Sequence, residues 1–80
     1  MTEERIRNTM AECAVGLTRH VMEIDKISHD EAYCKVLASE LFELVNNSDT
    51  RLYLEPNAEL SRLYDIEMAG GIDALYAAIA

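Results

Sequence analysis

The cysteines and histidines of this 80-residue chain are the first candidates for catalytic or metal-binding side chains. If residues 2–25 and 28–46 form an antiparallel pair of helices, His20 comes level with Cys34, and a thiol beside an imidazole can act as a nucleophile. Both residues, however, belong to apolar helical faces, where a free cysteine commonly packs as a small apolar side chain. We therefore expect no catalytic residue, and an enzyme that uses Cys34 and His20 is the third of three functional hypotheses.

The spacing of possible ligands argues against a metal site. Cys13 and His20 lie on one helical face but about 10 Å apart along its axis, too far for one ion with ligand bonds of ~2 Å. The polar run at residues 46–50 begins like a calcium loop, but its sixth position is Arg51 where glycine is needed and its twelfth is Asn57 where glutamate is needed. No glycine-rich loop follows a strand, so we expect neither a metal nor a cofactor.

The two thiols, Cys13 and Cys34, are predicted to be buried and structural. In the antiparallel pair they lie ~9 Å apart along the helix axes, which is too far for a disulfide. Neither thiol has a lysine or a helix N-terminus clearly placed to stabilise a thiolate, and burial raises the pKa of a thiol. We therefore expect both to react slowly with alkylating reagents.

The charge of the chain disfavours two classes of partner. Fifteen acidic residues face seven lysines and arginines, giving a net charge of -8, which repels nucleic-acid phosphates and anionic membranes. No apolar run approaches the ~20 residues of a membrane span, and the polar start lacks the apolar stretch of a signal peptide. We therefore expect a cytoplasmic protein that binds neither nucleic acid nor membrane.

Helices are the elements predicted to position these residues. Half of the residues are apolar, with three glycines and one proline, a composition typical of a single folded domain over residues 1–80. Apolar residues recur at spacings of three and four, the period of an amphipathic helix, in four segments. These segments are residues 2–25, 28–46, 57–69 and 72–79.

Local signals mark the ends of these helices. Ser28 and Glu31 form a capping box at the start of the second helix, and Gly70-Gly71 ends the third. Between those helices, alternating polar and apolar residues at 51–55, just before Pro56, predict a short extended segment. The predicted fold class is therefore all-α, a small helical bundle of four helices with one short extended segment.

The first two helices carry the main apolar stripes. The stripe of the first comprises Ile6, Met10, Cys13, Leu17, Val21 and Ile24. The stripe of the second comprises Tyr33, Cys34, Leu37, Leu41, Leu44 and Val45, and Phe42 lies off it. Because a second, thinner stripe runs along the opposite side of the first helix, that helix needs two neighbours or a second chain.

The surplus of apolar residues predicts a protein-binding surface. The candidate interface residues are Ala11, Val15, Thr18, Met22, Leu52, Tyr53, Leu54, Ile72, Leu75, Tyr76 and Ile79. A chain this small buries a limited share of its surface, so the favoured hypothesis is a protein-interaction module that self-associates as a homodimer or binds a protein partner. The second hypothesis is an acidic regulator that neutralises a partner protein or mimics nucleic acid, for which the carboxylates should form one continuous patch.

Residues 27–66 resemble part of a group of short, all-helical bacterial proteins of unknown function. The resemblance rests on the order ISHDEAY, NNSDT, TRLYLEP and NAELSRLYDIE, and its most specific part is Thr50, Leu52 and Tyr53. Some of these proteins resemble partners of toxin-like gene products. The resemblance therefore implies an antitoxin or accessory binding role, and it brings no catalytic residues.

Overall fold

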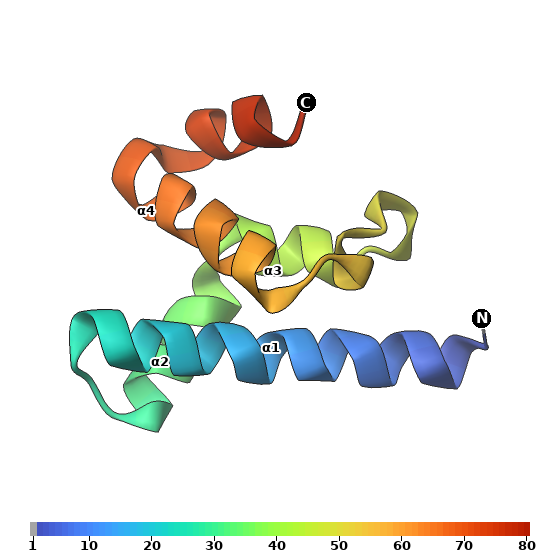
Figure 1. Cartoon of the computed structure of the whole chain (residues 1–80), viewed down its shortest axis with the longest axis horizontal. Coiled ribbons are helices and arrows are strands. Elements are labelled where there is room, and N and C mark those ends of the chain that lie inside the picture. Colours follow the sequence, from blue (N-terminus) through green and yellow to red (C-terminus); the bar gives the residue numbers. More distant parts are fainter. Residues whose placement is uncertain (1) are drawn as a thin grey trace.

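The computed structural model describes residues 2–80, and its secondary structure in that range is helical, without a strand. The elements are α1 (Glu3–Asp25), α2 (His29–Ala38), α3 (Glu40–Val45), the 3-10 turns η1 (Ser48–Thr50) and η2 (Leu52–Leu54), and α4 (Asn57–Ile79). Figure 1 shows α1 along one side of the molecule, with α4 packed over α3 on the other. The predicted all-α class is confirmed.

Helix α1 begins and ends as its sequence predicts. The Thr2 hydroxyl accepts a hydrogen bond from the backbone N–H of Arg5, and Lys26 ends the helix in the left-handed region at φ 56°. The predicted stripe is buried at Met10, Cys13, Leu17 and Val21, and partly buried at Ile6. Its last member, Ile24, is exposed, because it lies in the final turn and borders an open hollow beside Met68.

The predicted helix over residues 28–46 begins and ends where expected but is not continuous, because Ser39 divides it into α2 and α3. Ser39 has extended backbone angles, φ −78° and ψ 148°, and its side chain serves both helices. Its hydroxyl donates to the carbonyl of Val36 at 2.6 Å and accepts from the backbone N–H of Phe42 at 3.2 Å. A serine that bonds to the nearby backbone in this way competes with the regular helical pattern.

The break changes which side of the segment faces the core. The predicted stripe is wrong for Tyr33, Cys34 and Leu37, which are exposed. In α2 the residues that face the core lie about one residue around the helix from the predicted stripe. The buried apolar residues of α2 and α3 are Ala32, Val36, Leu41 and Val45. A single stripe cannot describe the segment, because the turn at Ser39 resets the helical phase.

A buried carboxylate on α4 fixes the start of α3. Glu67 accepts two hydrogen bonds at 2.9 Å, one from the backbone N–H of Glu40 and one from that of Leu41. Negative charge is favourable at the positive end of a helix, and these two N–H groups have no partner inside α3. Glu67 is 8% exposed and joins segments that are about a third of the chain apart.

The predicted extended segment at residues 51–55 is also wrong. Two 3-10 turns occupy this region, and Arg51 joins them in the left-handed region at φ 59°. The Thr50 hydroxyl donates to the carbonyl of Leu44 at 2.6 Å and accepts from the backbone N–H of Leu52. These local bonds replace a strand and turn Leu52 and Tyr53 into the core.

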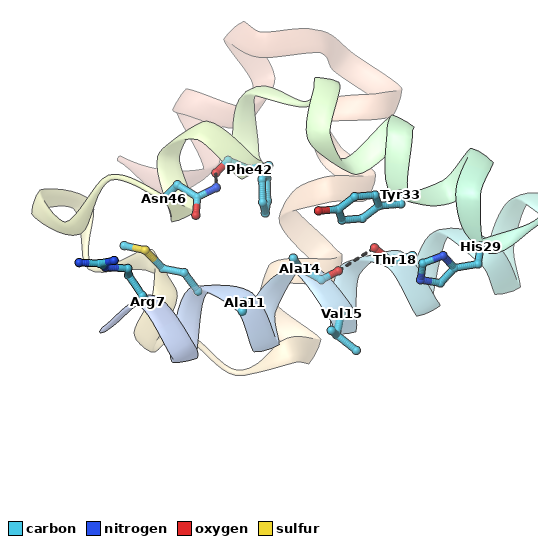
Figure 2. A pocket seen from close by; sticks show the side chains of 10 residues that line it. Arg7, Ala11, Ala14, Val15, Thr18, His29, Tyr33, Phe42 and Asn46 are labelled. Carbon is cyan, nitrogen blue, oxygen red and sulfur yellow. Dashed lines mark hydrogen bonds between the residues drawn. The ribbon is translucent and has the colours of Figure 1, made fainter. Parts of the chain in front are cut away.

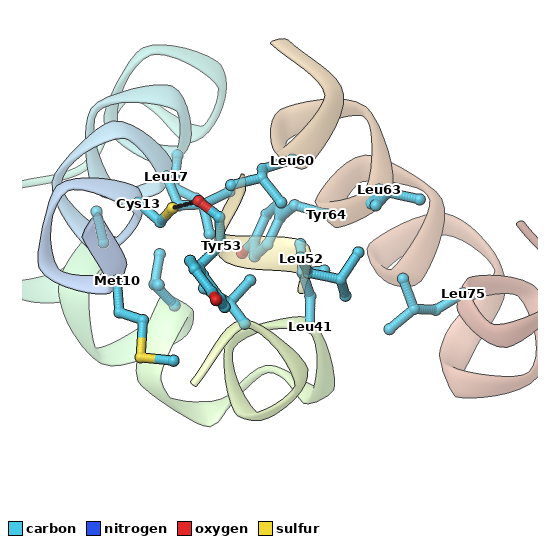
Figure 3. Packing of buried hydrophobic residues seen from close by; sticks show 14 residues of the cluster. Met10, Cys13, Leu17, Leu41, Leu52, Tyr53, Leu60, Leu63, Tyr64 and Leu75 are labelled. Carbon is cyan, nitrogen blue, oxygen red and sulfur yellow. Dashed lines mark hydrogen bonds between the residues drawn. The ribbon is translucent and has the colours of Figure 1, made fainter. Parts of the chain in front are cut away.

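The glycine pair bends α4 back onto the chain itself. Gly71 has φ 82° and ψ −174°, so the helical segments before and after it meet at a sharp kink where the third helix was predicted to end. After the kink, Leu75 is fully buried and the Tyr76 hydroxyl donates to Glu40 at 3.0 Å. The last segment therefore packs on its own chain, in the cluster where Leu17, Leu41 and Leu60 meet (Figure 3).

Replacing Glu67 with Ala is expected to lower the free energy of unfolding by about 3 kcal/mol, because two backbone N–H groups lose a charged acceptor in a buried setting. Glu67→Gln, which keeps one acceptor oxygen, should cost less. Glu43→Ala, on the exposed side of α3, is the control and should change stability by less than about 0.5 kcal/mol. Urea unfolding followed by circular dichroism measures all three, and equal losses for Glu67→Ala and Glu43→Ala would contradict the capping role.

Candidate protein-binding surface

A groove runs between α1 and the α2–α3 segment (Figure 2). Its volume is about 550 Å³, and it is lined by Arg7, Met10, Ala11, Ala14, Val15, Thr18, His29, Tyr33, Phe42 and Asn46. The rings of Tyr33 and Phe42 form one side, and the short side chains of Ala11 and Ala14 form the other. The groove is therefore apolar along its middle and polar towards its ends.

The break at Ser39 brings the two aromatic rings to the same groove. Tyr33 and Phe42 are nine residues apart, which is about two and a half turns of a continuous helix, so an unbroken helix would place them on opposite sides. With the turn at Ser39, both rings face α1. The same residue that divides the helix thus builds the aromatic wall of the groove.

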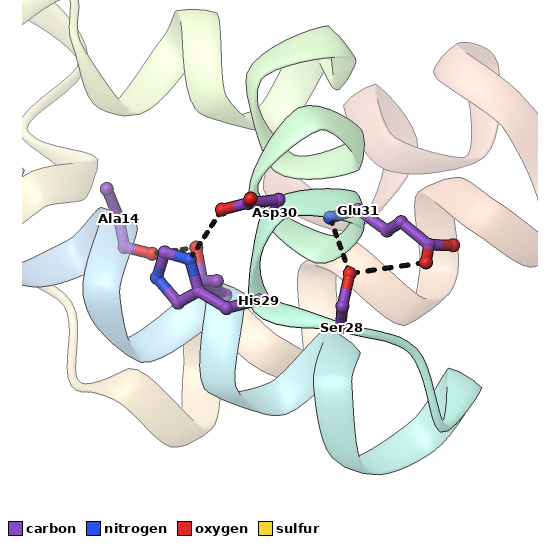
Figure 4. A network of polar contacts seen from close by, with 6 residues as sticks. Ala14, Ser28, His29, Asp30 and Glu31 are labelled. Atoms are coloured by element: carbon purple, nitrogen blue, oxygen red, sulfur yellow. Dashed lines mark hydrogen bonds and ion pairs between the residues drawn. The ribbon is translucent and has the colours of Figure 1, made fainter.

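The polar side chains that line the groove already contact residues close to them in the sequence. Arg7 pairs with Glu3 at 3.1 Å, and the Thr18 hydroxyl donates to the carbonyl of Ala14 at 2.7 Å. The ring of His29 stacks on that of Tyr33, and its Nδ1 lies 3.5 Å from the carboxylate of its neighbour Asp30. Figure 4 draws the contact with Asp30 beside the capping box of Ser28 and Glu31. None of the ten lining residues is Cys, Asp or Glu, so this groove offers a contact surface without an acid or a thiol.

A second hollow lies on the other side of the exposed ridge of α1. It encloses about 370 Å³ and is lined by Ala11, Glu12, Val15, Gly16, Arg19 and Asn57. We call the exposed residues Ala11, Glu12, Val15 and Arg19 the α1 outer face. Val15 lines both hollows and is 55% exposed, so its apolar side chain stands as a knob between two depressions.

Gly16 sets the depth of the second hollow. A β-carbon at this position would lie 2.8 Å from the side chain of Asn57, closer than β-carbon contacts normally come. Glycine therefore lets the first residue of α4 approach α1 directly, beside the outer face.

Comparison with models of protein families, with curated proteins and with solved structures finds no match for this chain. The resemblance of residues 27–66 to short bacterial proteins stays a prediction.

The predicted interface residues do not form one surface. Ala11, Val15 and Thr18 line the groove, with Thr18 buried at its base. Met22 packs against the core, and three others are buried in the chain itself: Leu52, Tyr53 and Leu75. The remaining four are exposed away from the groove, and they are Leu54, Ile72, Tyr76 and Ile79.

The candidate interface residues leave out several that line these two hollows, among them Tyr33, Phe42, Glu12 and Arg19. Tyr33 was assigned to the core stripe of a continuous helix. Phe42 lies off that stripe, which is the signal in the sequence that the segment has a second apolar direction. Glu12 and Arg19 gave no signal, because isolated charges on a helix are typical of any solvated face.

Within residues 2–80 no hydrogen bond joins Cys34 to His20. His20 Nε2 lies 2.8 Å from the carboxylate of Asp65 on α4, and its ring meets Tyr64 edge to face. The prediction that both thiols are buried is wrong for Cys34, which is exposed because it lies on the side of α2 opposite the buried residues Ala32 and Val36. Cys13 is buried, and its thiol donates to the carbonyl of Tyr53.

Tyr64 is the buried polar side chain that lacks a partner within residues 2–80. Burial raises the pKa of its phenol, and the nearby carboxylate of Asp25 raises it further, so the group keeps its proton. A hollow lined by Asp25, Lys35 and Asp65 borders this residue. Within the same range, no three His, Cys, Asp or Glu side chains lie close enough to hold a metal ion, and no helix has the length and apolarity to cross a membrane.

The two thiols are expected to react at different rates. Burial, and then the charge of Glu12, raises the pKa of the Cys13 thiol, so it should stay unmodified in the native protein while the exposed Cys34 is labelled by iodoacetamide. Mass spectrometry of the digested protein locates the label, and labelling in denaturant is the control in which both thiols react. Native labelling of Cys13 as fast as Cys34 would contradict the buried position.

Tyr64→Phe is expected to raise the free energy of unfolding by about 1 kcal/mol, because it removes a buried hydroxyl that has no hydrogen-bond partner. Tyr76→Phe is the matched control, since it removes a hydroxyl that donates to Glu40, and it should lower stability slightly. Chemical denaturation measures both. A clear loss of stability in Tyr64→Phe would mean that this hydroxyl is paired in solution.

Proposed function

We propose that this chain is a small, non-catalytic protein-interaction module that self-associates through the α1 outer face and the adjoining groove. The observation that carries the proposal is Val15, an apolar side chain that is 55% exposed between two hollows. Covering such a side chain is favourable by about 25 cal/mol for each Å² removed from water. A second chain is the simplest means of covering it.

The groove also suits a protein contact because excluding water from it has a small desolvation cost. The hydroxyl of Thr18 is already bonded to Ala14, and the two ionisable residues of the lining, Arg7 and His29, have partners on their own helices. Polar groups that are satisfied before binding carry a smaller desolvation cost than free ones. Tyr33 and Phe42 add aromatic area, the kind that dominates protein interfaces.

The distribution of the carboxylates favours the module over the acidic regulator. Each of the four helices carries at least two of the fifteen acidic residues, so they are spread over all elements of the fold. Several are neutralised locally, as in the pairs of Asp25 with Lys35 and of Glu59 with Arg62. The net charge of -8 supports a protein partner over nucleic acid or an anionic membrane, and it opposes open-ended aggregation, which supports a closed dimer.

The cysteines support a reducing location for this module. Cys34 is an exposed free thiol, and such a thiol persists most readily where glutathione and thioredoxin keep proteins reduced. We therefore place the proposed module in the cytoplasm.

Val15→Asp is expected to make the protein monomeric, because it puts a charge at the centre of the proposed contact. Leu54→Asp is a closely matched control, since Leu54 is an apolar residue of η2 that is 54% exposed and lines neither hollow. The control should sediment as a dimer, like the wild type. Analytical ultracentrifugation over a micromolar range measures both, and a wild-type protein that stays monomeric at high micromolar concentration would overturn the proposed function.

A further inference from the structure

Two opposite charges flank Val15 on the α1 outer face. Glu12 and Arg19 are exposed, line the same hollow, and lie seven residues apart, about 10 Å along the helix. Neither takes part in an ion pair within residues 2–80. The point midway between them falls between Val15 and Gly16, beside the knob.

From this arrangement we infer that a second copy of the chain packs antiparallel along α1, so that Glu12 of each copy faces Arg19 of the other. The inference rests on the proposed function and specifies its geometry. A two-fold axis that passes between Val15 and Gly16 brings the two Val15 side chains together. It also places one ion pair about 5 Å along the helix on each side of the axis.

The same charges favour the antiparallel arrangement over the parallel one. Glu12 and Arg19 lie on the same flank of the helix, so a two-fold axis parallel to the helices would put their copies on the opposite flank of the contact and leave both charges unpaired. A perpendicular two-fold axis joins equal flanks, and Glu12 of each copy then meets Arg19 of the other. The order of charges along the face therefore selects the direction of the partner.

The composition of the face explains how a chain of net charge -8 can meet its own copy. Glu12 and Arg19 balance, so the α1 outer face itself carries no net charge. The short side chain of Ala11 allows the helices to approach closely. A stable interface buries about 800 Å² on each partner. The chain exposes 5145 Å² in total, and α1 contributes an exposed side that is ~34 Å long.

Charge reversal tests this pairing. Glu12→Arg and Arg19→Glu should each raise the dimer dissociation constant about tenfold, because each replaces two attractive contacts with two repulsive ones. The double variant Glu12→Arg/Arg19→Glu keeps the net charge of the wild type and restores both pairs with the signs exchanged. Its dissociation constant should return to within about threefold of the wild-type value.

Mixing the two single variants provides a second measurement. The Glu12→Arg chain offers two positive residues and the Arg19→Glu chain two negative ones, so the mixture should form a heterodimer tighter than either homodimer. Glu55→Arg is the control for net charge, because Glu55 is exposed and lines neither hollow, and it should leave the dissociation constant near that of the wild type. Sedimentation equilibrium with one chain fluorescently labelled measures each constant, and circular dichroism checks that each variant is folded.

The outcomes separate the inference from the function on which it rests. Rescue in the double variant together with heterodimer formation supports the antiparallel pairing. A wild-type dimer that Val15→Asp dissociates, combined with a double variant as weak as the single ones, overturns the pairing and leaves the proposed function standing. A monomeric wild type overturns both.

Discussion

The carboxylate of Glu67 connects the two halves of the chain. It binds two backbone N–H groups at the start of α3 while its own helix, α4, packs over α3 and α1. Without this acceptor the first turn of α3 would hold unpaired N–H groups in a nearly dry setting, a costly arrangement. This contact stabilises the start of α3 beyond the break at Ser39, and so helps to hold Phe42 in the aromatic wall of the groove.

Local signals explain which parts of the fold could be predicted. The spacing in α1, the capping box of Ser28 and the glycine pair at Gly70-Gly71 each act within a few residues, and each appears in the structure. The break at Ser39 could not be predicted in the same way, because the carboxylate that stabilises the new helix start lies 26 and 27 residues away. The 3-10 turn at Leu52–Leu54 was missed because an alternating pattern does not distinguish a strand from a short turn that buries Leu52 and Tyr53.

The candidate site divides in the same manner. Ala11 and Val15 follow from the second stripe of a single helix, so the sequence was sufficient to place them on an unpartnered face. Tyr33 and Phe42 lie beside that face because the helix is broken at Ser39, and a periodic pattern of apolar residues does not reveal such a break. The sequence therefore predicts the α1 wall of the groove, but not the aromatic wall, because the helix that carries it is interrupted.

The shortness of α3 has a consequence for the order in which the molecule assembles. A helix of six residues is far below the length of ~12 to 15 at which isolated helices become even marginally stable, so it forms when α4 supplies its cap. α1, with 23 residues and its own capping signals, depends less on distant parts of the chain. The aromatic wall should thus be among the last regions to become ordered during folding and among the first to open by local unfolding, with the slowest amide exchange in the central turns of α1. An occupant of the groove would slow exchange in α3 most of all, since binding would stabilise the region whose own structure depends on a contact from far along the chain.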